Sequence, residues 1–474
     1  GRSSLPSLQV VHKLMVLDEI SMWHDISHSH VQRYMQQNPY RLLAFSFLGV
    51  MIIGTLLLML PMASAQGQTT ALVDAAFTAV SCVSVTGLAT VDTYYHWSLF
   101  GKLVMVILIQ LGGLGIVSFT TIIALLLGKR VGLKNRVLLS EDVGQDGMTG
   151  LLHITKKLTL YTFAIEIVGG IIYTIQLYPY IGQAALYTGI MQAVSTFCNA
   201  GFVFFDNDLP YAMVGDILFN INTAVLIVIG GFGYLAAFDI WSHRKVRRFV
   251  DLKLHTKIML VGTAILILLG TIIFLGVEWS NPKTFGSLPI WNKIMASLFQ
   301  AITPRTSGIA TVDYNALHPI TLFVTIILMF IGAGPNSTGG GVKISTVAVT
   351  ILASRTLFNN HPDTEFFERR ISLVTVLKDN GIIFLSLIPI LIATCYLAWD
   401  EPYDFIRLLF EVTSAFGTVG LTTGITPDLS ESSKWVLMLV MFTGRVGVMT
   451  VIGTWALRTS PTKPIGYAEE NVLL

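Results

Sequence analysis

Charged residues are scarce in this sequence. Asp, Glu, Lys and Arg make up only 12% of its 474 residues, whereas soluble domains carry about 25%. Hydrophobic residues make up 53%, and the mean hydropathy is +0.68. This composition excludes an ordinary soluble protein of about three domains and indicates one continuous membrane domain. The net charge of +2 is too small to indicate a nucleic-acid partner.

Cysteine and histidine are also rare. The three cysteines, Cys82, Cys198 and Cys395, are scattered among apolar segments, which excludes a disulfide framework and a metal motif. Histidine is almost absent from the apolar stretches, and no cluster of nucleophile, base and metal ligand is visible in them. We therefore expect no catalytic residues, no covalent cofactor and no structural metal. Because Gly1–Gln37 lacks an apolar core, we also expect no cleavable signal peptide.

Long apolar runs are what the sequence does have. A membrane-spanning helix needs about 20 mostly apolar residues. Eight stretches qualify as candidates: Leu42–Met62, Leu99–Leu127, Leu158–Ile175, Gly215–Trp241, Ile258–Val277, Leu322–Leu352, Val374–Ala398 and Trp435–Leu457. The connections alternate between two kinds. One kind is basic, as in "GKRVGLKNR", and the other is a short apolar run followed by a polar stretch that contains glycine.

The second kind of connection repeats one phrase four times. "SVTGLATVD" and "RTSGIATVD" are almost alike, and "FCNAGFVFFDND" and "FGTVGLTTG" align with them. The aligned glycines are Gly87, Gly201, Gly308 and Gly420, at spacings of 114, 107 and 112 residues. A regular period is typical of stacked or ring-like repeat units. Each unit would contain a span, a short apolar helix, a polar glycine stretch and a second span.

The apolar run before each glycine has only about ten residues, too few to cross a bilayer as a helix. We interpret it as a re-entrant half helix. The polar stretch after it cannot face lipid, because its backbone amides would have no hydrogen-bond partners there. Four ordinary external loops with amphipathic lead-ins are the alternative. The recurrence of the pattern between two spans in all four units favours four polar stretches around one pore.

The residue types suit a cation pore. Cation filters use rings of backbone carbonyls in place of the hydration shell of the ion. Glycine can adopt φ > 0, which lets neighbouring carbonyls face one axis, and the negative ends of four half-helix dipoles would favour a cation there. The predicted filter residues are Val85, Thr86, Gly87, Asn199, Ala200, Gly201, Thr306, Ser307, Gly308, Thr418, Val419 and Gly420.

The distribution of Lys and Arg predicts the orientation. The two termini and three basic connections hold 22 of the 30, so the positive-inside rule assigns them to the cytoplasm. Both termini are then cytoplasmic, and the half helices enter from outside. On the outer side we count six basic residues and thirteen acidic ones. Acidic side chains around the outer entrance of a pore would raise the local cation concentration. The alternative is that these acidic residues only keep the external loops hydrated, and it explains the count nearly as well.

Two positive charges remain inside apolar spans, Lys343 and Arg445, where ionisable residues are costly and indicate function. Lys343 belongs to Gly332–Thr346, "GAGPNSTGGGVKIST", whose glycines and proline disfavour a continuous helix. We predict a non-helical gate loop that faces the cavity below the filter. A phosphate loop is excluded because its lysine would stand at Gly340. Arg445 would bond free carbonyls of the loop or the filter; a purely structural charge is the alternative.

The predicted gate residues are Gly332, Ala333, Gly334, Pro335, Asn336, Ser337, Thr338, Gly339, Gly340, Gly341 and Lys343, with Arg445 as the partner of the gate. One further ionisable residue, Glu166, lies within the third span. We expect it to hydrogen-bond a neighbouring Thr or Tyr in helix packing rather than to relay ions.

These motifs resemble the Trk/Ktr/HKT superfamily of potassium transporters. The resemblance rests on the four glycine phrases, the broken span "GPNSTGGGVKIST" and the "GRVG" of the last span. From about residue 40 onward the chain is similar to the membrane subunits of bacterial Ktr potassium uptake systems, because a single span, Leu42–Met62, precedes the first half helix. The third phrase has Ser307 and Ile309, where members often carry Ala and Phe.

The resemblance implies an all-α membrane protein of four M1–P–M2 repeats (span, re-entrant pore helix, span) around one pseudo-fourfold pore, like a potassium channel. The implied boundaries are a cytosolic tail 1–40, repeats 41–128, 129–242, 243–358 (with the broken span 332–346) and 359–458, and a cytosolic tail 459–474. It also implies that the four glycines form the filter, that Gly332–Thr346 is the gate, and that Arg445 interacts with it.

The implied function is potassium uptake across the cell (inner or plasma) membrane, with K⁺ bound in the filter and Na⁺ as an activator. The implied assembly is a homodimer in membrane lipid, seated on a cytosolic KtrA-like ring that binds ATP or ADP. A TrkH-like or sodium-conducting member of the superfamily remains an alternative. A membrane enzyme or a two-fold secondary carrier is disfavoured, because the chain shows four repeats of one orientation rather than an inverted pair.

Overall fold

The computed structural model describes residues 39–115, 151–243, 249–359 and 363–456. The predicted C-terminal tail, nearly all of the predicted N-terminal tail, residues 116–127 of the second predicted span and most of the first basic connection lie outside the described residues. The chain forms two compact units. The larger is Phe45–Val448, and the smaller comprises Gly1–Ala44 and Met449–Leu474. Within the smaller unit, the Arg41 Nε donates to the Thr454 carbonyl at 2.8 Å.

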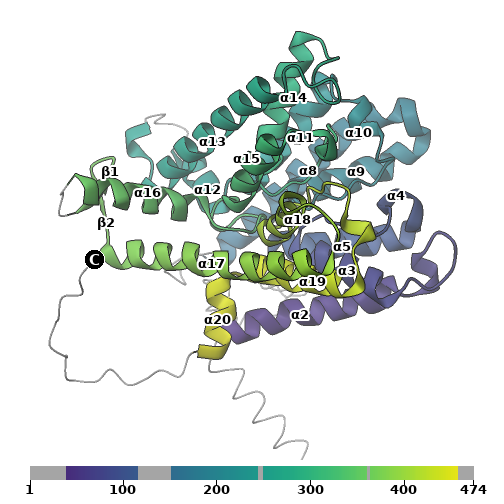
Figure 1. The fold of residues 1–474 in the computed structure, drawn as a ribbon, viewed down its shortest axis with the longest axis horizontal. Helices are drawn as coiled ribbons and strands as arrows, with labels where there is room; N and C mark the ends of the chain where they lie inside the picture. The colour runs from purple at the N-terminus through teal and green to yellow at the C-terminus, as the bar shows by residue number, and fades with distance from the viewer. Residues whose placement is uncertain (1–38, 116–150, 244–248, 360–362, 457–474) are drawn as a thin grey trace, which may run out of the picture. The chain divides into compact units, whose positions relative to one another are not determined.

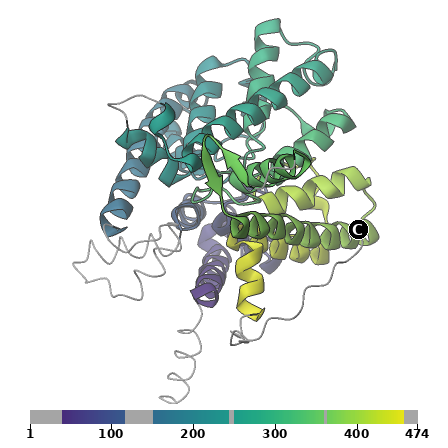
Figure 2. The same ribbon diagram turned by 90° about the vertical axis from the view of Figure 1, so that its left-hand side faces the viewer.

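Most of the described chain is helical, as Figures 1 and 2 show. Four helices have thirteen residues each: α3 (Leu72–Ser84), α9 (Ala185–Phe197), α14 (Ile290–Ile302) and α18 (Phe405–Gly417). The other apolar helices are α2 (Pro39–Leu58), α5 (Leu99–Leu114), α8 (Leu151–Ile181), α11 (Ile217–Gly231), α12 (Tyr234–Ser242), α13 (Leu254–Glu278), α15 (Pro319–Phe330), α16 (Ile344–Phe358), α17 (Leu373–Asp400), α19 (Glu431–Val446) and α20 (Val448–Ala456). Short helical turns, including α4 (Thr93–His96) and α10 (Leu209–Ala212), lie in the connections.

Membrane-spanning helices account for the hydropathy. Within the described residues, four helices are long and apolar enough to cross a membrane, and six if each of two interrupted helix pairs counts as one span. The four are Arg41–Leu58, Lys157–Phe197, Leu254–Glu278 and Leu373–Asp400. The long helices expose large apolar side chains, such as Leu160 at 70% and Leu268 at 61%. Surfaces of this kind are unfavourable in water and suit a lipid environment.

The predicted span Gly215–Trp241 is interrupted. Phe232 and Gly233 separate α11 from α12, and the axes of the two helices differ by 97°. The prediction of one unbroken helix is therefore wrong. Gly233 has φ +95°, and a Cβ built on it would lie 2.6 Å from the Pro335 carbonyl oxygen. The break therefore needs glycine both for its backbone conformation and for its close contact with another loop.

The last predicted span, Trp435–Leu457, is interrupted in the same way. Gly447, with φ +91°, separates α19 from α20. The broken stretch that the sequence did predict is present, because no helix covers the chain between Phe330 and Ile344. The helix resumes two residues before the predicted end of the loop.

A short antiparallel hairpin interrupts the expected all-α chain. β1 (Thr364–Phe366) pairs with β2 (Arg369–Ile371) between α16 and α17. The two turn residues, Phe367 and Glu368, have φ +49° and +59°, the pattern of a type I′ turn that fits the twist of the strands. The sequence "TEFFERRI" gives no clear hairpin signal, since its turn residues are Phe and Glu rather than Gly or Asn.

Each thirteen-residue helix packs against longer neighbours. α3 lies on α5 and α19, α9 on α8, α14 on α13, and α18 on α17 and α19. One apolar cluster joins α17, α18 and α19 around Leu408 and Leu437. Another joins α13, α15 and α18 around Phe274, Leu328 and Phe410. This packing holds the carboxyl ends of the four thirteen-residue helices inside the larger unit.

Candidate functional site

Four glycine segments follow the thirteen-residue helices: 85–87, 199–201, 306–308 and 418–420. They share one backbone pattern. The first residue of each segment has positive φ: Val85 59°, Asn199 58°, Thr306 73° and Thr418 50°. The last residue is the glycine, with φ of 95°, 71°, 73° and 91° in Gly87, Gly201, Gly308 and Gly420. A left-handed conformation costs a non-glycine residue about 1–2 kcal/mol. Its recurrence at four equivalent places means that surrounding contacts hold it.

The four glycines lie side by side in a closed ring. A Cβ built on Gly87 would lie 2.8 Å from the Gly201 Cα, and one on Gly201 would lie 2.7 Å from the Ser307 carbonyl oxygen. A Cβ on Gly308 would lie 2.9 Å from the Gly420 Cα, and one on Gly420 would lie 3.0 Å from the Gly87 Cα. Every glycine therefore faces the next segment, and a side chain at any of them would meet backbone.

Carbonyl groups surround this ring. The oxygens beside the glycines belong to the preceding residues: Thr86, Ala200, Ser307 and Val419. The carboxyl ends of α3, α9, α14 and α18 lead directly into the segments, and helix carboxyl ends carry partial negative charge. Carbonyl dipoles and helix ends of this sign favour a cation and disfavour an anion.

The inner end of each segment is tied to its own helix. Backbone amides donate to helix carbonyls in all four: Thr86 to Ser81 at 2.8 Å, Ala200 to Ser195 at 2.7 Å, Ser307 to Thr303 at 3.0 Å and Val419 to Ser414 at 2.9 Å. The hydroxyls of the same serines and threonine bond the next part of the segment. Ser81 and Ser414 accept from the glycine amides, and Ser195 and Thr303 donate to the carbonyls of Phe202 and Ile309. These anchors were not predicted, although a serine six residues before the glycine recurs in three phrases.

The non-helical stretch Ile331–Lys343, here the intramembrane loop, lies against the first residues of three segments. The Gly340 amide donates to the Thr418 hydroxyl at 2.9 Å, and the Asn199 side-chain amide hydrogen-bonds the Thr338 hydroxyl at 3.2 Å. A Cβ on Gly339 would collide with the Thr306 hydroxyl. The loop therefore lies directly beside the ring, on the side where the four thirteen-residue helices end.

The intramembrane loop is also bonded to the break between α11 and α12. The Gly334 amide donates to the Gly231 carbonyl at 2.9 Å, and the Tyr234 amide donates to the Asn336 carbonyl at 2.9 Å. The loop and this break therefore form one hydrogen-bonded unit. Movement of either would disturb the other.

Two positively charged side chains of the predicted spans, Lys343 and Arg445, both donate hydrogen bonds to backbone carbonyls. The Lys343 Nζ donates to the Gly339 carbonyl at 2.7 Å. The Arg445 guanidinium donates through Nη1 to the Thr338 carbonyl and through Nη2 to the Gly112 carbonyl. The expected contact between Arg445 and the loop is thus observed, while its role as the partner of a gate stays a prediction. The contact with Gly112 ties the loop to α5 as well.

Glu166 lies behind the second segment. It is 3% exposed and accepts from the Gln110 Nε2 at 3.3 Å, and the Cys198 Sγ lies 3.8 Å from its Oε1. The expectation of a Thr or Tyr partner is wrong. Cys198 also packs against the end of α5 at Gly113: a Cβ on Gly113 would lie 2.6 Å from the Cys198 Sγ, so only glycine allows this contact.

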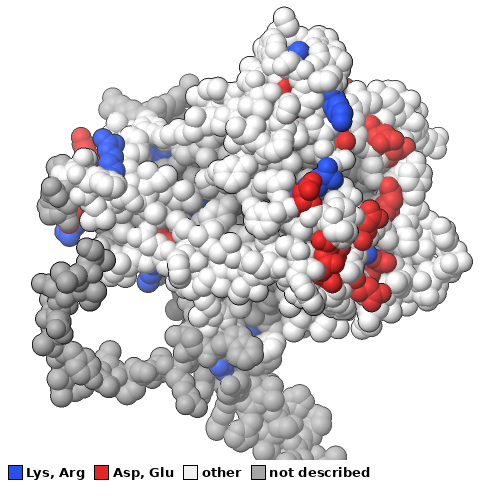
Figure 3. All heavy atoms as spheres, in the orientation of Figure 1, with Lys and Arg blue, Asp and Glu red and all other residues white. Residues whose placement is uncertain are grey.

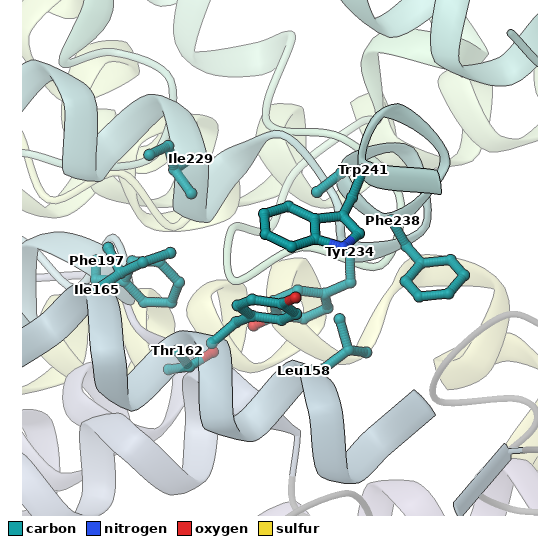
Figure 4. Close-up of a pocket in the computed structure, with 10 residues that line it drawn as sticks. Leu158, Thr162, Ile165, Phe197, Ile229, Tyr234, Phe238 and Trp241 are labelled. Atoms are coloured by element: carbon teal, nitrogen blue, oxygen red, sulfur yellow. The ribbon is translucent and has the colours of Figure 1, made fainter. Parts of the chain in front are cut away.

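An apolar cavity of about 200 Å³ lies beside the break between α11 and α12. Figure 4 shows aromatic and aliphatic side chains of α8, α11 and α12 around it. The rings of Tyr161 and Trp241 lie 5.3 Å apart at its wall. Its described lining is aliphatic and aromatic apart from the hydroxyls of Thr162 and two tyrosines, whereas the ring of glycines gathers backbone carbonyls and is therefore the candidate ion site.

Acidic side chains gather at the end of the larger unit that carries α4 and α10, as the face in Figure 3 shows. Two contacts link the outer ends of the first and second segments there. The Tyr95 hydroxyl donates to the Asp206 Oδ2 at 2.9 Å, and the Asn207 Nδ2 donates to the Asp92 Oδ2 at 2.6 Å. The hairpin β1–β2, which carries acidic and basic side chains together, lies at the opposite end (Figure 3).

The chain matches known cation transporters over nearly its whole length. The family model "TrkH: Cation transport protein" matches residues 9–461. The chain is 38% identical over 428 residues to the Ktr system potassium uptake protein B of Bacillus subtilis, covering 90% of this chain and 95% of that protein. It is 32% identical over 443 residues to the potassium/sodium uptake protein NtpJ of Enterococcus hirae, covering 92% of this chain and 97% of that protein.

The fold has a solved neighbour. The crystal structure of the potassium transporter TrkH from Vibrio parahaemolyticus superposes with a TM-score of 0.67, over 86% of this chain and 84% of that one. The identity of 18% means that this likeness concerns the fold alone. The resemblance read from the motifs is confirmed by the family match and the Ktr relatives: the chain belongs to the TrkH family of cation transport proteins.

Proposed function

We propose that this chain takes up potassium ions as the ion-conducting subunit of a Ktr-type system, through four M1–P–M2 repeats around one pseudo-fourfold pore. The observation that carries the proposal is the closed ring of Gly87, Gly201, Gly308 and Gly420. Four equivalent segments, each after a thirteen-residue helix, supply the carbonyls that a filter needs. The relatives named as potassium uptake proteins support potassium as the ion.

The ion would be held by the predicted filter residues. Backbone carbonyls beside the four glycines would replace water around K⁺. The hydroxyls of Thr306 and Ser307 are buried without a hydrogen-bond partner among the described residues, which suits oxygen ligands for a cation. The carboxyl ends of the pore helices add negative potential without a net charge.

The intramembrane loop would be the gate. Its backbone lies beside the ring and is bonded to Thr418, Asn199 and Arg445. Because the loop is not helical, few of its backbone hydrogen bonds are fixed by regular structure, so it can adopt a second packing at small cost. Arg445 and Lys343, bonded to loop carbonyls, would stabilise the closed packing.

The remaining parts of the proposal concern the assembly. We place the chain in the cell (inner or plasma) membrane as a homodimer with both termini in the cytoplasm, on a KtrA-like ring that binds ATP or ADP, with Na⁺ as an activator. Two relatives are named as parts of a Ktr system, which supports a partner subunit. The gathering of acidic side chains at one end of the larger unit (Figure 3) supports an outer mouth at that end, where they would raise the local cation concentration.

The experiment is potassium uptake by potassium-starved cells that lack their own uptake systems and express the chain together with a KtrA-like ring. We expect uptake at low external K⁺ that sodium stimulates, and none from cells with an empty vector. Sodium uptake without potassium uptake would replace the proposal by the sodium-conducting alternative.

A further inference from the structure

The outer part of each glycine segment runs back along the helix that precedes it. Residues three positions after the glycine therefore lie beside the middle of that helix. These residues are Thr90, Phe204, Thr311 and Thr423, and all four are buried. Irregular backbone at this depth needs hydrogen-bond partners from the protein. The middle of the helix supplies such a partner for the backbone of the second and fourth segments, and a partner for a side-chain hydroxyl in the third.

The second and fourth helices use the same position, nine residues before the glycine. The Gln192 Oε1 accepts from the Phe204 amide at 3.1 Å, and the Glu411 Oε1 accepts from the Thr423 amide at 2.8 Å. Gln192 is 1% exposed and Glu411 is fully buried. Each side chain thus spans the distance between its helix and the outgoing backbone.

The third helix uses the neighbouring position. The Gln300 Nε2 donates to the Thr311 hydroxyl at 2.9 Å, and its Oε1 accepts from the Tyr314 hydroxyl at 2.6 Å. Gln300 stands eight rather than nine residues before its glycine, and α14 ends six residues before Gly308, earlier than α18 ends before Gly420.

The first helix has no such side chain. Thr78 stands nine residues before Gly87, but its hydroxyl donates to the Asp74 carbonyl of its own helix at 2.8 Å. The Thr90 hydroxyl is buried and has no hydrogen-bond partner among the described residues. In the second, third and fourth segments, a side chain of the preceding helix therefore hydrogen-bonds the residue three positions after the glycine, whereas in the first segment no described side chain of that helix does so.

We propose that Gln192, Gln300 and Glu411 are positioning residues that set the ion selectivity of the ring. Each fixes the distance between its helix and the chain that follows the glycine, a role that we call bracing. This inference rests on the proposed function of the ring. The inner end of each of these three segments is already tied to its helix end through the backbone carbonyl of Ser195, Thr303 or Ser414. With the outer end tied as well, the carbonyls between the two ties cannot move outward or inward to suit a different ion.

Glu411 differs from the two glutamines in its charge. It accepts from the hydroxyls of Thr422 and Thr426 at 2.7 and 2.8 Å in addition to the Thr423 amide. None of the ion pairs found within the described residues includes it. A bracing role depends on its acceptor oxygen, whereas an electrostatic role depends on its charge, and the isosteric Glu411→Gln change separates the two.

The test uses the full chain in liposomes, with the ratio of K⁺ to Na⁺ flux as the readout. Gln192→Leu, Gln300→Leu and Glu411→Leu should each lower this ratio by about two- to tenfold or more, because each change removes at least one intramolecular hydrogen bond. Gln192→Glu and Glu411→Gln keep the acceptor and should retain the wild-type ratio. Thr78→Val, at the unbraced position, is the matched control and should also retain it.

Each outcome decides one point. An unchanged ratio in the leucine variants would overturn the bracing role, and so would a loss of selectivity in Glu411→Gln as large as in Glu411→Leu. Where a leucine variant fails to insert into the membrane, Gln192→Asn and Glu411→Asp take its place. Shortening the side chain by one methylene breaks the same hydrogen bond. An unchanged ratio of K⁺ to Na⁺ flux in these variants would contradict the proposal. Wild-type protein that does not select K⁺ would refute the function of the ring itself.

Discussion

Arg445 joins carbonyls from two distant parts of the chain, Thr338 in the intramembrane loop and Gly112 at the end of α5. A charged donor shared by two carbonyls is worth more than a neutral one, about 1.5–3 kcal/mol per bond. We therefore predict that Arg445→Leu raises ion flux in the absence of a regulatory partner by about tenfold or more, while Arg445→Lys has a smaller effect.

Flux of K⁺ or Rb⁺ into liposomes that contain the purified chain measures this effect. The control is Arg407→Leu, since Arg407 lies on the outer part of α18 and outside the proposed gate. Wild-type flux in correctly inserted Arg445→Leu protein would show that the residue is structural only.

At the level of single residues, glycine was the most informative type. The repeated phrase located Gly87, Gly201, Gly308 and Gly420, and the structure brings them into one ring. The side chains that hold the segments were not predicted. The serine six residues before three of the glycines, such as Ser195, is a recurring pattern that was missed, whereas a buried glutamine such as Gln192 in an apolar helix has no distinctive pattern. Only the return of the chain along its own helix reveals their partners.

The intramembrane loop is the element on which the gating proposal depends. Deleting Asn336–Gly341 would remove the bonds to Tyr234, Thr418 and Arg445. We predict higher ion flux and weaker dependence on the regulatory ring. Flux is measured with and without the ring, in protein shown to be inserted and dimeric, and an unaltered flux would mean that the loop does not obstruct the path.

The breaks at Gly233 and Gly447 show what the sequence does not contain. Both glycines lie in apolar runs that look like uninterrupted spans, as do Gly112 and Gly113, which remain inside the α5 helix. Local composition does not distinguish a packing glycine from a helix break. The difference at Gly233 arises from tertiary contact, because the loop carbonyl of Pro335 lies against it. In Gly332–Thr346 the proline and five glycines made the break predictable.

On the scale of the whole molecule, the composition and the four-fold phrase were sufficient to predict a helical membrane transporter. Membership of a cation transport family confirms the expectation that the chain is not an enzyme. The hairpin β1–β2 was not predicted, since two three-residue strands carry too little pattern. The repeat boundaries and the dimer remain predictions, and so does the surface on which the cytosolic ring would dock. Arg247 and Arg248 are candidates for that surface, and they lie outside the described residues.

The division of labour between two subunits is testable on the whole chain. The predicted cytosolic parts, such as Gly128–Lys157 and Ser242–Lys257, are short basic connections that suit docking of a partner rather than a nucleotide pocket of their own. We predict that the purified chain alone binds neither ATP nor ADP, whereas its complex with a KtrA-like ring binds both. Isothermal calorimetry decides this, and stoichiometric nucleotide binding by the isolated chain would refute it.

The ring of four glycines is the centre of this account, and ion selectivity of Gly420→Ser tests it most directly. A serine at φ +91° is strained by about 1–2 kcal/mol, and its Cβ would meet the Thr86 carbonyl and lie 3.0 Å from the Gly87 Cα. Gly424→Ser is the matched control, with φ +88° but no atom within 4 Å of the added Cβ. We predict that the ratio of K⁺ to Na⁺ flux falls about tenfold in Gly420→Ser and keeps its wild-type value in Gly424→Ser. An unchanged ratio in inserted Gly420→Ser protein would contradict the assignment of the ring as the filter.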